Sequence, residues 1–443
     1  MRTSARILIL CTLLVCLSTT AYAATRYVAT TGNNANAGTL SSPWATIQYG
    51  VNQLAAGDTL YVRGGTYMEN VLMWNKHGSS TAVIYVVNYP NESPVIDGTG
   101  KTESGFVINE SSYIYFGGFE VRNNAKSGVF IWDAHHVEVA WNDVHGNQKF
   151  GIHAGTDTFG LTHDVVIRGN EVYDNVRHNV NGTASPWMQA LSAYQADKVE
   201  IVGNYVHENY GEGIDYIVSD EGNIHENYIW DNKSVNLYLD NATSTKVDRN
   251  FIVTGWSSHE TDFYRDGHPN PGIAAANEYY DYQNPLNNLT ITNNIVLFCS
   301  TGFVYWNSQY AGGLQNTTIA NNTFYGATDY ALFWIEDDNH ANTVVKNNIF
   351  RQTSGLDMAW APTNGITYAY NNWYGGNANT HMSGTGDVLS NPLFVNAGGS
   401  DADDYKLTST SPCRNTGTTV SAVTTDYWGT ARSATYDIGA HEY

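Results

Sequence analysis

Two short segments of the chain combine acidic side chains with an alternating apolar pattern. GEGIDYIV contains Glu212 and Asp215, and SVNLYLD ends in Asp240. Both segments alternate apolar and polar residues, as a strand with one buried face does, so Asp215 and Asp240 should share the other face. Glu212, earlier in its segment, offers a further carboxylate to that face. Carboxylates in this arrangement supply the oxygen ligands that Ca²⁺ prefers. Paired carboxylates also carry out glycoside hydrolysis, and the residues leave both kinds of chemistry open.

Two long loops, Asp174–Pro186 and Val253–Pro271, are expected to border the same face. Loops of this length in a compact fold tend to be functional. If the substrate is acidic, a cation must neutralise its carboxylate. Removal of the proton on the carbon next to that carboxylate then needs Lys, Arg, His or Tyr as a base. The residues that could serve as base or clamp are Lys233, His178, Arg265 and Tyr264.

The expected substrate contacts are polar and aromatic. His153, Asn236 and Tyr238 fall at positions that should lie on the acidic face. Further along, GFVYWN and YALFWIED must each project an aromatic ring outward, and flat rings suit the apolar faces of sugars. We expect Trp306 and Trp334 to be these contacts. The register is open at this point, however, and the alternative outward pair is Tyr305 and Phe333.

A repeating element must position these residues. The pattern V-x-I-x-x-N, followed by a β-branched or aromatic pair, recurs as VEVAWNDV, VEIVGNYV and LTITNNIV, among others. The recurring asparagines are Asn142, Asn170, Asn204, Asn227, Asn250, Asn294, Asn322 and Asn348. In YIYFGGFEV, Gly118 should take the asparagine position. The closest spacing is 23 residues, which predicts an all-β, single-stranded parallel solenoid of about 23-residue coils that bury their apolar sides by stacking.

An asparagine that recurs at one turn can bond the turns above and below it, because its amide both donates and accepts. The side chain also tolerates a left-handed backbone, which such a turn requires. If the asparagine lies between the second and third strands, the next first strand begins about nine to thirteen residues later. Asp215 and Asp240 then lie one coil and two residues apart, or roughly 8 Å. That separation fits an inverting pair of carboxylates.

The two ends of the chain resemble those of secreted pectate-lyase-like β-helix proteins. The carrying segments are YVATTGNNANAGTLSSPWATIQYGVNQLAAGDTLYVRGGTY near the start, and SPCRNTG, TDYWGTAR and YDIGAHEY at the end. The resemblance implies a right-handed parallel β-helix with a capping helix at Ala45–Leu54, before a first strand at Asp58–Val62. It also implies a substrate groove on the first sheet. It does not define the chemistry, because that superfamily holds lyases, hydrolases, epimerases and non-enzymes.

Residues 1–23 read as a signal peptide, with a basic start, an apolar core and Ala-Tyr-Ala before the cleavage point. We therefore expect a secreted, monomeric β-helix domain over residues 24–443. Within it, residues 24–121 form the N-terminal cap and first coils, 122–360 the central coils, and 361–443 the last coils and C-terminal cap. Cys299 and Cys413 are the only cysteines in that domain, and a bond between them is left open.

The net charge of −21 argues against nucleic acid and anionic membranes as partners, because both require a basic surface. The charge is also unfavourable for an acidic polymer unless a cation such as Ca²⁺ intervenes. Aromatic residues make up 13% of the chain, nearly as much as the 14% that are charged. This composition favours a rigid protein with aromatic contact surfaces.

Three functions remain open at this stage. The leading one, favoured mainly by the resemblance, is a lyase that cleaves a uronate-containing polysaccharide by β-elimination, with Glu212, Asp215 and Asp240 as Ca²⁺ ligands. The second is an inverting glycoside hydrolase that uses Asp215 and Asp240. The third is a solenoid that binds glycans without cleaving them. The calcium and catalytic motifs expected of known pectate, alginate and chondroitin lyases are not found, so no catalytic residue is transferred from them.

Overall fold

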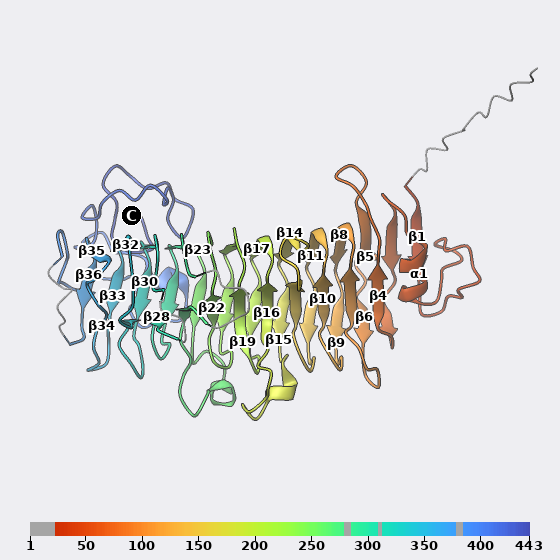
Figure 1. Ribbon diagram of the computed structural model, residues 1–443, viewed down its shortest axis with the longest axis horizontal. Coiled ribbons are helices and arrows are strands. Elements are labelled where there is room, and N and C mark those ends of the chain that lie inside the picture. Colours follow the sequence, from red (N-terminus) through yellow and green to blue (C-terminus); the bar gives the residue numbers. More distant parts are fainter. Residues whose placement is uncertain (1–22, 279–284, 309–311, 378–383) are drawn as a thin grey trace, which may run out of the picture.

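The computed structural model describes residues 23–278, 285–308, 312–377 and 384–443. The predicted signal peptide, residues 1–23, lies outside these residues except for Ala23. The described chain winds into a solenoid whose strands form three long parallel sheets (Figure 1). This confirms the predicted all-β, right-handed parallel β-helix.

We number the sheets by the order of strands within a coil. Sheet 1 contains β4 (Val71–Trp74), β7 (Phe106–Asn109), β10 (Val129–Trp132), β13 (Ile152–Gly155), β16 (Gln189–Tyr194), β19 (Glu212–Ile217), β22 (Leu237–Asp240), β25 (Ile273–Ala276), β28 (Phe303–Trp306), β31 (Phe333–Ile335) and β34 (Ala359–Trp360). Sheet 2 contains β1 (Thr25–Val28), β2 (Thr59–Val62), β5 (Ile84–Asn88), β8 (Ser112–Gly117), β11 (His135–Ala140), β14 (His163–Arg168), β17 (Asp197–Val202), β20 (Asn223–His225), β23 (Lys246–Asp248), β26 (Thr290–Thr292), β29 (Thr318–Ala320), β32 (Thr343–Lys346) and β35 (Ile366–Ala369). Sheet 3 contains β3 (Gly65–Tyr67), β6 (Pro94–Asp97), β9 (Glu120–Arg122), β12 (Asp143–His145), β15 (Glu171–Tyr173), β18 (Tyr205–His207), β21 (Tyr228–Trp230), β24 (Phe251–Val253), β27 (Ile295–Leu297), β30 (Thr323–Tyr325), β33 (Ile349–Arg351) and β36 (Asn372–Tyr374).

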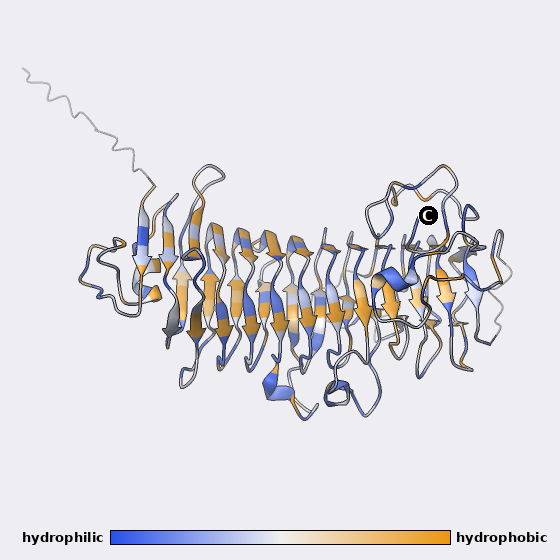
Figure 2. Cartoon of the chain, turned by 180° about the vertical axis from the view of Figure 1, so that it is seen from behind, coloured by the Kyte–Doolittle hydropathy of each residue, from blue (hydrophilic) through white to orange (hydrophobic). Residues whose placement is uncertain are grey.

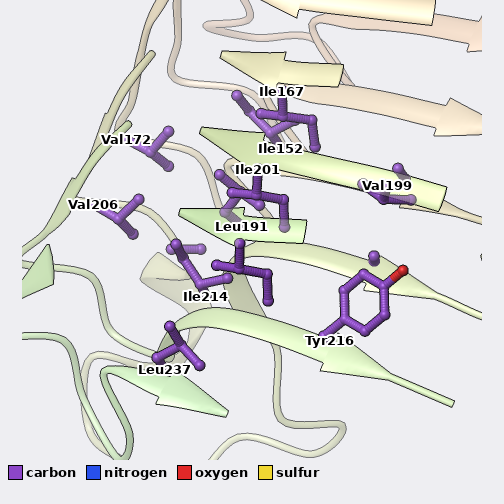
Figure 3. Close-up of a cluster of buried hydrophobic side chains, with 14 of the residues drawn as sticks. Ile152, Ile167, Val172, Leu191, Val199, Ile201, Val206, Ile214, Tyr216 and Leu237 are labelled. Carbon is purple, nitrogen blue, oxygen red and sulfur yellow. The ribbon is translucent and has the colours of Figure 1, made fainter. Parts of the chain in front are cut away.

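The core is a column of apolar side chains enclosed by the three sheets. In sheet 1, Ile152, Leu191, Ile214 and Leu237 are register partners on successive coils, and all four are fully buried (Figure 3). Figure 2 shows apolar and polar residues alternating along the strands. Each such side chain contributes about 1.5–3 kcal/mol by leaving water. The core fixes the register, because a slip by one residue would turn every apolar side chain outward.

The predicted asparagine ladder runs between sheets 2 and 3. Asn204 donates from Nδ2 to Oδ1 of Asn227 at 3.1 Å, and Asn227 donates in the same way to Asn250 at 2.9 Å. From Asn170 onward, each amide also donates to a backbone carbonyl of the preceding coil, as Asn227 does to Ile201. The ladder continues to Asn371, beyond the last asparagine that the repeat identified. Every coil is thereby joined to both of its neighbours.

Two details of the predicted turn are wrong. The ladder position on the early coil is Phe119, whose backbone N–H donates to Asn142 Oδ1 at 3.0 Å, and Gly118 precedes it. The left-handed conformation belongs to the residue before each asparagine, for example Trp141 at φ 60° and Glu226 at φ 57°. The turn therefore selects asparagine for its amide hydrogen bonds, and the residue before it takes the unusual backbone.

A second ladder, which the sequence analysis missed, lies five residues further along, where sheet 3 turns toward sheet 1. Its members are Asn124, Asn147, Asn175, Asn209 and Asn232. Asn236 closes it by accepting from the backbone N–H and Nδ2 of Asn232. The repeated spacing of five residues after the first ladder was the available signal.

The N-terminal end of the stack is closed by α1 (Ile47–Gln53), whose N-cap Thr46 accepts a hydrogen bond from the backbone N–H of Tyr49. The predicted helix is confirmed, and the strand predicted at Asp58–Val62 is present as β2, but it is not the first strand. β1 precedes the helix and pairs with β2, so the helix lies between the first two strands of sheet 2. No helix of the described residues is long and apolar enough to span a membrane.

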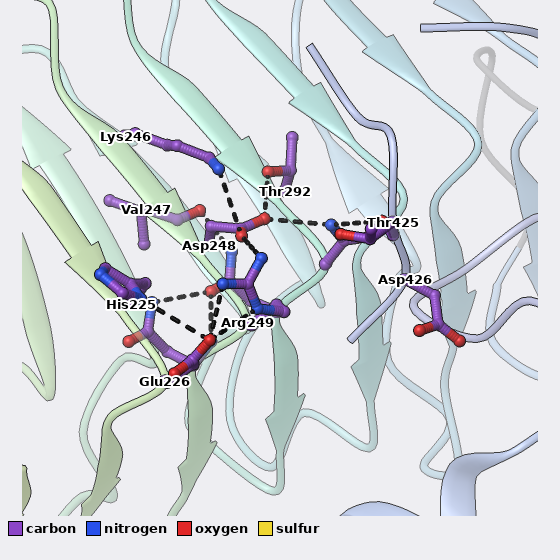
Figure 4. Close-up of polar contacts among 12 residues, drawn as sticks. His225, Glu226, Lys246, Val247, Asp248, Arg249, Thr292, Thr425 and Asp426 are labelled. Carbon is purple, nitrogen blue, oxygen red and sulfur yellow. Dashed lines mark hydrogen bonds and ion pairs between the residues drawn. The ribbon is translucent and has the colours of Figure 1, made fainter. Parts of the chain in front are cut away.

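The C-terminal segment, residues 393–443, folds back along the last coils and carries the 3₁₀ helix η3 (Ala402–Tyr405). Its anchors are the left-handed asparagines before the ladder: Asn293 donates to Thr425 O, Asn321 to Asp437 O and Asn347 to Thr418 O. Figure 4 shows Thr425 beside the polar network of sheet 2. Cys299 and Cys413 are both buried free thiols, so they form no disulfide with each other.

Candidate functional site

The site lies on the outer face of sheet 1, between two loops that leave the solenoid on the same side (Figure 1). The first loop carries the 3₁₀ helix η1 (Arg177–Asn179), and the second carries η2 (Glu260–Phe263). Asn270 holds the second loop in place, because its Nδ2 donates to Asn232 O at 2.6 Å and to Phe263 O at 2.8 Å. The loop is thus fastened directly to the turn where the second ladder ends.

Four carboxylates form an acidic cluster at the centre of this face: Glu212, Asp215, Asp240 and Glu278. Asp215 on β19 is the register partner of Tyr238 on β22, and Asp240 lies two residues beyond Tyr238. The Cα atoms of Asp215 and Asp240 are therefore roughly 8 Å apart, from the strand and rung spacings. Glu212, Asp215 and Asp240 are only 7%, 1% and 2% exposed. The sequence placed these three acids on one face, and the structure buries them there.

Burial and the repulsion between like charges oppose full ionisation of the acidic cluster. Burial, followed by the neighbouring Asp240 and Glu212, holds the pKa of Asp215 well above its usual range. Burial raises the pKa of Glu212 to about 8, and the nearby Arg265 partly opposes this. Within the described residues, Asp215 Oδ1 and Glu212 Oε2 are buried without a hydrogen-bond partner. Such oxygens are costly to bury unless a proton or a cation satisfies them.

Tyr238 connects the acidic cluster to the aromatic part of the face. Its hydroxyl donates to Glu278 Oε1 at 2.6 Å, and its ring packs edge-on against Trp306 at 5.9 Å between centroids. Burial and the adjacent acids keep the pKa of Tyr238 far above its usual value. The phenol therefore stays protonated and acts as a hydrogen-bond donor.

A groove of about 350 Å³ opens beside the acidic cluster. Trp306 and Trp334 line it, whereas Tyr305 and Phe333 are fully buried in the core. This settles the register in favour of the two tryptophans. Trp334 also packs against Trp360 on the next coil at 4.9 Å, so the groove continues into an aromatic surface toward the C-terminal end.

Arg265 lies at the groove wall nearest the acids. Its guanidinium lies 4.8 Å from the ring centroid of Trp187, and its Nη1 donates to Ser234 Oγ at 3.0 Å. Lys233 is the neighbour of Ser234, and its Nζ donates to Asp262 O at 3.3 Å. Burial lowers the pKa of Lys233. Among the predicted basic residues, Lys233 and Arg265 are therefore the two that join the turn at Ser234 to the second loop.

His178 and Tyr264 are not among the residues that line the groove, and neither is Lys233, which precedes the lining residue Ser234. The two ring nitrogens of His178 contact the carbonyl oxygens of Gln148 at 2.5 Å and Pro186 at 3.3 Å, so the ring fastens the first loop. Tyr264 is half-buried, and burial raises its pKa. The structure therefore separates these two candidates from Arg265.

Two predicted substrate contacts are placed differently from expectation. His153 is on sheet 1, but it is buried against Phe130 and Phe150, its Nδ1 lies 2.8 Å from Ser192 Oγ, and burial lowers its pKa to about 3. The prediction that Asn236 faces outward with the acids is wrong. Its amide is fully buried in the second ladder, because it comes before the strand β22 begins to alternate.

Glu278 and Trp187 were not predicted from the sequence. Glu278 lies two residues beyond Ala276, the register partner of Asp240, so continuing the coil count through β25 would have found it. Trp187 follows the first loop and offers no periodic signal, because its place under Arg265 depends on how two loops meet.

The fold defines the class of protein to which this chain belongs. The protein is a right-handed parallel β-helix of the pectate-lyase-like superfamily. Residues 26–323 match the family described as "Pel9A-like, right handed beta helix region", and the chain belongs to that family.

Similarity to individual proteins is more limited. A stretch of 77 residues is 40% identical to pectate lyase PEL9 of Emericella nidulans, and it covers 17% of this chain and 19% of that relative. The crystal structure of the pectate lyase Pel9A superposes with a TM-score of 0.58 at 18% identity, over 95% of this chain and 96% of that one. The complex of XylC with xylose gives a TM-score of 0.66 at 13% identity, over 94% and 98%. At these identities the two structures support the fold alone.

Proposed function

We propose that this protein is a secreted lyase that cleaves a uronate-containing polysaccharide by β-elimination. The observation that carries the proposal is the buried acidic cluster beside Arg265 and a tryptophan-lined groove. A bound cation would satisfy such a cluster, and an acidic polymer needs the same positive charge to approach a protein of net charge −21.

Glu212, Asp215, Asp240 and Glu278 form an oxygen donor set of the kind that Ca²⁺ prefers. The two buried oxygens of Asp215 and Glu212 without hydrogen-bond partners within the described residues fit such a cation. When bound, Ca²⁺ would neutralise the uronate carboxylate and so make the neighbouring C–H bond more acidic. The proposal assigns the cation to these residues and leaves its coordination geometry open.

The chain's own residues then have distinct roles. Trp306 and Trp334 hold sugar rings by their apolar faces, and Arg265 pairs with the uronate carboxylate. Lys233 takes the proton from the carbon next to that carboxylate, a double bond forms to the adjacent carbon, and the 4-oxygen leaves with its electron pair. The lowered pKa of Lys233 supports this role, because a base needs a fraction of neutral amine.

The first substrate to test is pectate, because a relative at 40% identity over 77 residues is named a pectate lyase. The mature protein would be incubated with pectate, alginate, glycosaminoglycans and neutral glycans, with Ca²⁺ or with EDTA. Ultraviolet absorbance detects the unsaturated product, and a reducing-sugar assay runs alongside. We expect unsaturated product with Ca²⁺ only. If the protein bound these polymers but cleaved none of them, we would conclude that it is a glycan-binding solenoid and not a lyase.

The assigned roles are tested with matched variants. Lys233→Met should lower turnover by about 10²–10⁴-fold, the usual contribution of a general base. Arg265→Met should mainly raise KM for the acidic polymer. Arg177→Met, an exposed arginine on the other loop, is the control. If Lys233→Met retained full turnover, the base would have to be reassigned.

One observation favours a second function, inverting glycoside hydrolysis. The raised pKa of Asp215 favours the protonated carboxyl that a general acid needs. The Cα atoms of Asp215 and Asp240 are roughly 8 Å apart, a spacing compatible with a water between the two carboxyl groups. This reaction would release reducing ends without unsaturated product, and it would continue in EDTA. The same assay therefore separates the two reactions.

A further inference from the structure

Sheet 2 carries a cluster of three histidines, on a different sheet from the groove. His135 and His136 open β11, and His163 opens β14 on the next coil, where it is the register partner of His135. The His135 and His163 rings stack at 4.7 Å between centroids with an angle of 4°. One ligand nitrogen from each ring lies within 4.8 Å of the other two.

The backbone explains how two consecutive histidines meet. His136 has φ 53°, a left-handed conformation that interrupts the alternation of the strand. The Nδ1 atoms of His135 and His136 consequently lie 2.8 Å apart. Tyr113, one coil earlier, stacks on His136 at 4.3 Å and supports the ring.

The neighbours of the cluster are acidic. Asp164 Oδ2 lies 2.6 Å from His163 Nδ1, which leaves Nε2 of that ring for another partner. Such a carboxylate–histidine pair is the usual outer shell of a metal-binding imidazole. Asp197, the register partner of His163 on the following coil, has a buried Oδ1 with no hydrogen-bond partner among the described residues.

A small cavity of about 190 Å³ lies next to the cluster. It is lined by Phe159, Gly160, His163, Asp197, Lys198, Asp220 and Glu221.

We propose that His135, His136 and His163 bind one divalent transition-metal ion of the Zn²⁺, Ni²⁺ or Cu²⁺ class. Three imidazoles select these ions over Ca²⁺, which takes oxygen ligands. Asp164 orients His163, and Asp197 adds a carboxylate on the adjoining coil as the register partner of His163. Tetrahedral Zn²⁺ with bonds of about 2.0–2.1 Å needs donors about 3.3 Å apart, so His135 and His136 separate slightly on binding. The ion would clamp two coils on the side of the solenoid away from the polysaccharide groove.

The experiment uses the full mature chain without a histidine tag, stripped with EDTA and titrated with ZnCl₂ by calorimetry. We expect one equivalent to bind. His163→Ala and His136→Ala should each weaken binding at least 10-fold, and Asp164→Asn should weaken it less. His259→Ala, an exposed histidine on the second loop, should bind as the parent does.

Two results would overturn the proposal: no bound equivalent, or binding that the His136 and His163 variants leave unchanged. Circular dichroism establishes that each variant is folded, and His163→Gln replaces His163→Ala if the alanine variant is not. Electron paramagnetic resonance of the Cu²⁺ form gives an independent readout. Coupling to three nitrogens supports the site, and coupling to fewer than two contradicts it. The result does not depend on polysaccharide cleavage.

Discussion

At the scale of single residues, the acidic cluster combines burial with like charges. In the unfolded chain Glu212 has an ordinary pKa near 4.5, and in the folded protein it is raised to about 8. Below pH 4.5 the Glu212 carboxyl carries its proton in both the folded and the unfolded state. Between the two values only the folded state keeps it, so the free energy of unfolding falls as pH rises, by up to about 1.4 kcal/mol per pH unit.

This predicts that the metal-free protein is less stable at pH 8 than at pH 5. Urea unfolding in EDTA at both values measures the difference. Glu212→Gln should flatten the dependence, because its amide does not titrate. An unchanged slope in this variant would mean that Glu212 does not hold the extra proton.

Ca²⁺ should stabilise the folded protein, because it would bind the folded acidic cluster and not the unfolded chain. A hundredfold excess over Kd gives about 2.7 kcal/mol. Asp215→Asn should abolish this gain while keeping the fold, since the amide is nearly the same size and removes a buried charge. Thermal unfolding with and without Ca²⁺ measures the gain. Asp157→Asn, an exposed acid, is the control and should keep it.

The sequence correctly predicted the positions of residues that follow strand periodicity. Asp215, Tyr238 and Asp240 lie on the predicted face because alternation and coil length define their positions. Asn236 was misplaced because it lies in the turn before β22, where alternation does not apply. The burial of the acids could not be predicted, because an alternating pattern indicates which face of the sheet a side chain lies on and not how far it is buried.

At the scale of elements, the asparagine ladders join one coil to the next. Asn227→Ala should lower the free energy of unfolding by about 1–3 kcal/mol, because it removes the acceptor of the buried Asn204 backbone N–H and the Nδ2 donor to the Ile201 carbonyl. Chemical denaturation measures the change. Asn316→Ala is the matched control, since Asn316 also bridges two coils but is exposed. An equal loss in both variants would argue against a special role for the buried ladder.

The elements themselves were predictable where the repeat is regular. Coils of 23 residues and the capping helix follow from periodicity and from resemblance. The strand β1 did not, because it precedes the helix and has no repeat before it. The second ladder was also visible in principle, at a constant offset of five residues from the first.

At the scale of the whole molecule, the C-terminal segment bonds three successive coils at once, at Asn293, Asn321 and Asn347. Arg432 is its central residue. The side chain is fully buried, bonds Asn293 Oδ1 at 2.8 Å and Gly439 O at 2.9 Å, and pairs with Glu442 at 3.3 Å. A solenoid otherwise has only neighbour-to-neighbour contacts, so this segment should make the last coils unfold together.

Arg432→Met is expected to cost about 3–5 kcal/mol, because it leaves Glu442 buried without its counter-charge. The last coils should then unfold in a separate, earlier transition, which calorimetry would resolve. Arg177→Met removes an exposed ion pair and should cost at most about 1 kcal/mol. A single unshifted transition in Arg432→Met would show that the segment adds little cohesion.

The asparagine ladder also has a direction. Each amide of the first ladder donates from its backbone N–H and its Nδ2 to the Oδ1 of the coil that follows it in the chain. A coil is therefore completed only by the one made after it. A chain emerging from the ribosome always carries one unfinished coil at its growing end. Thr418, Thr425 and Asp437, which are made after these coils, fasten Asn347, Asn293 and Asn321 only once the coils themselves have been synthesised.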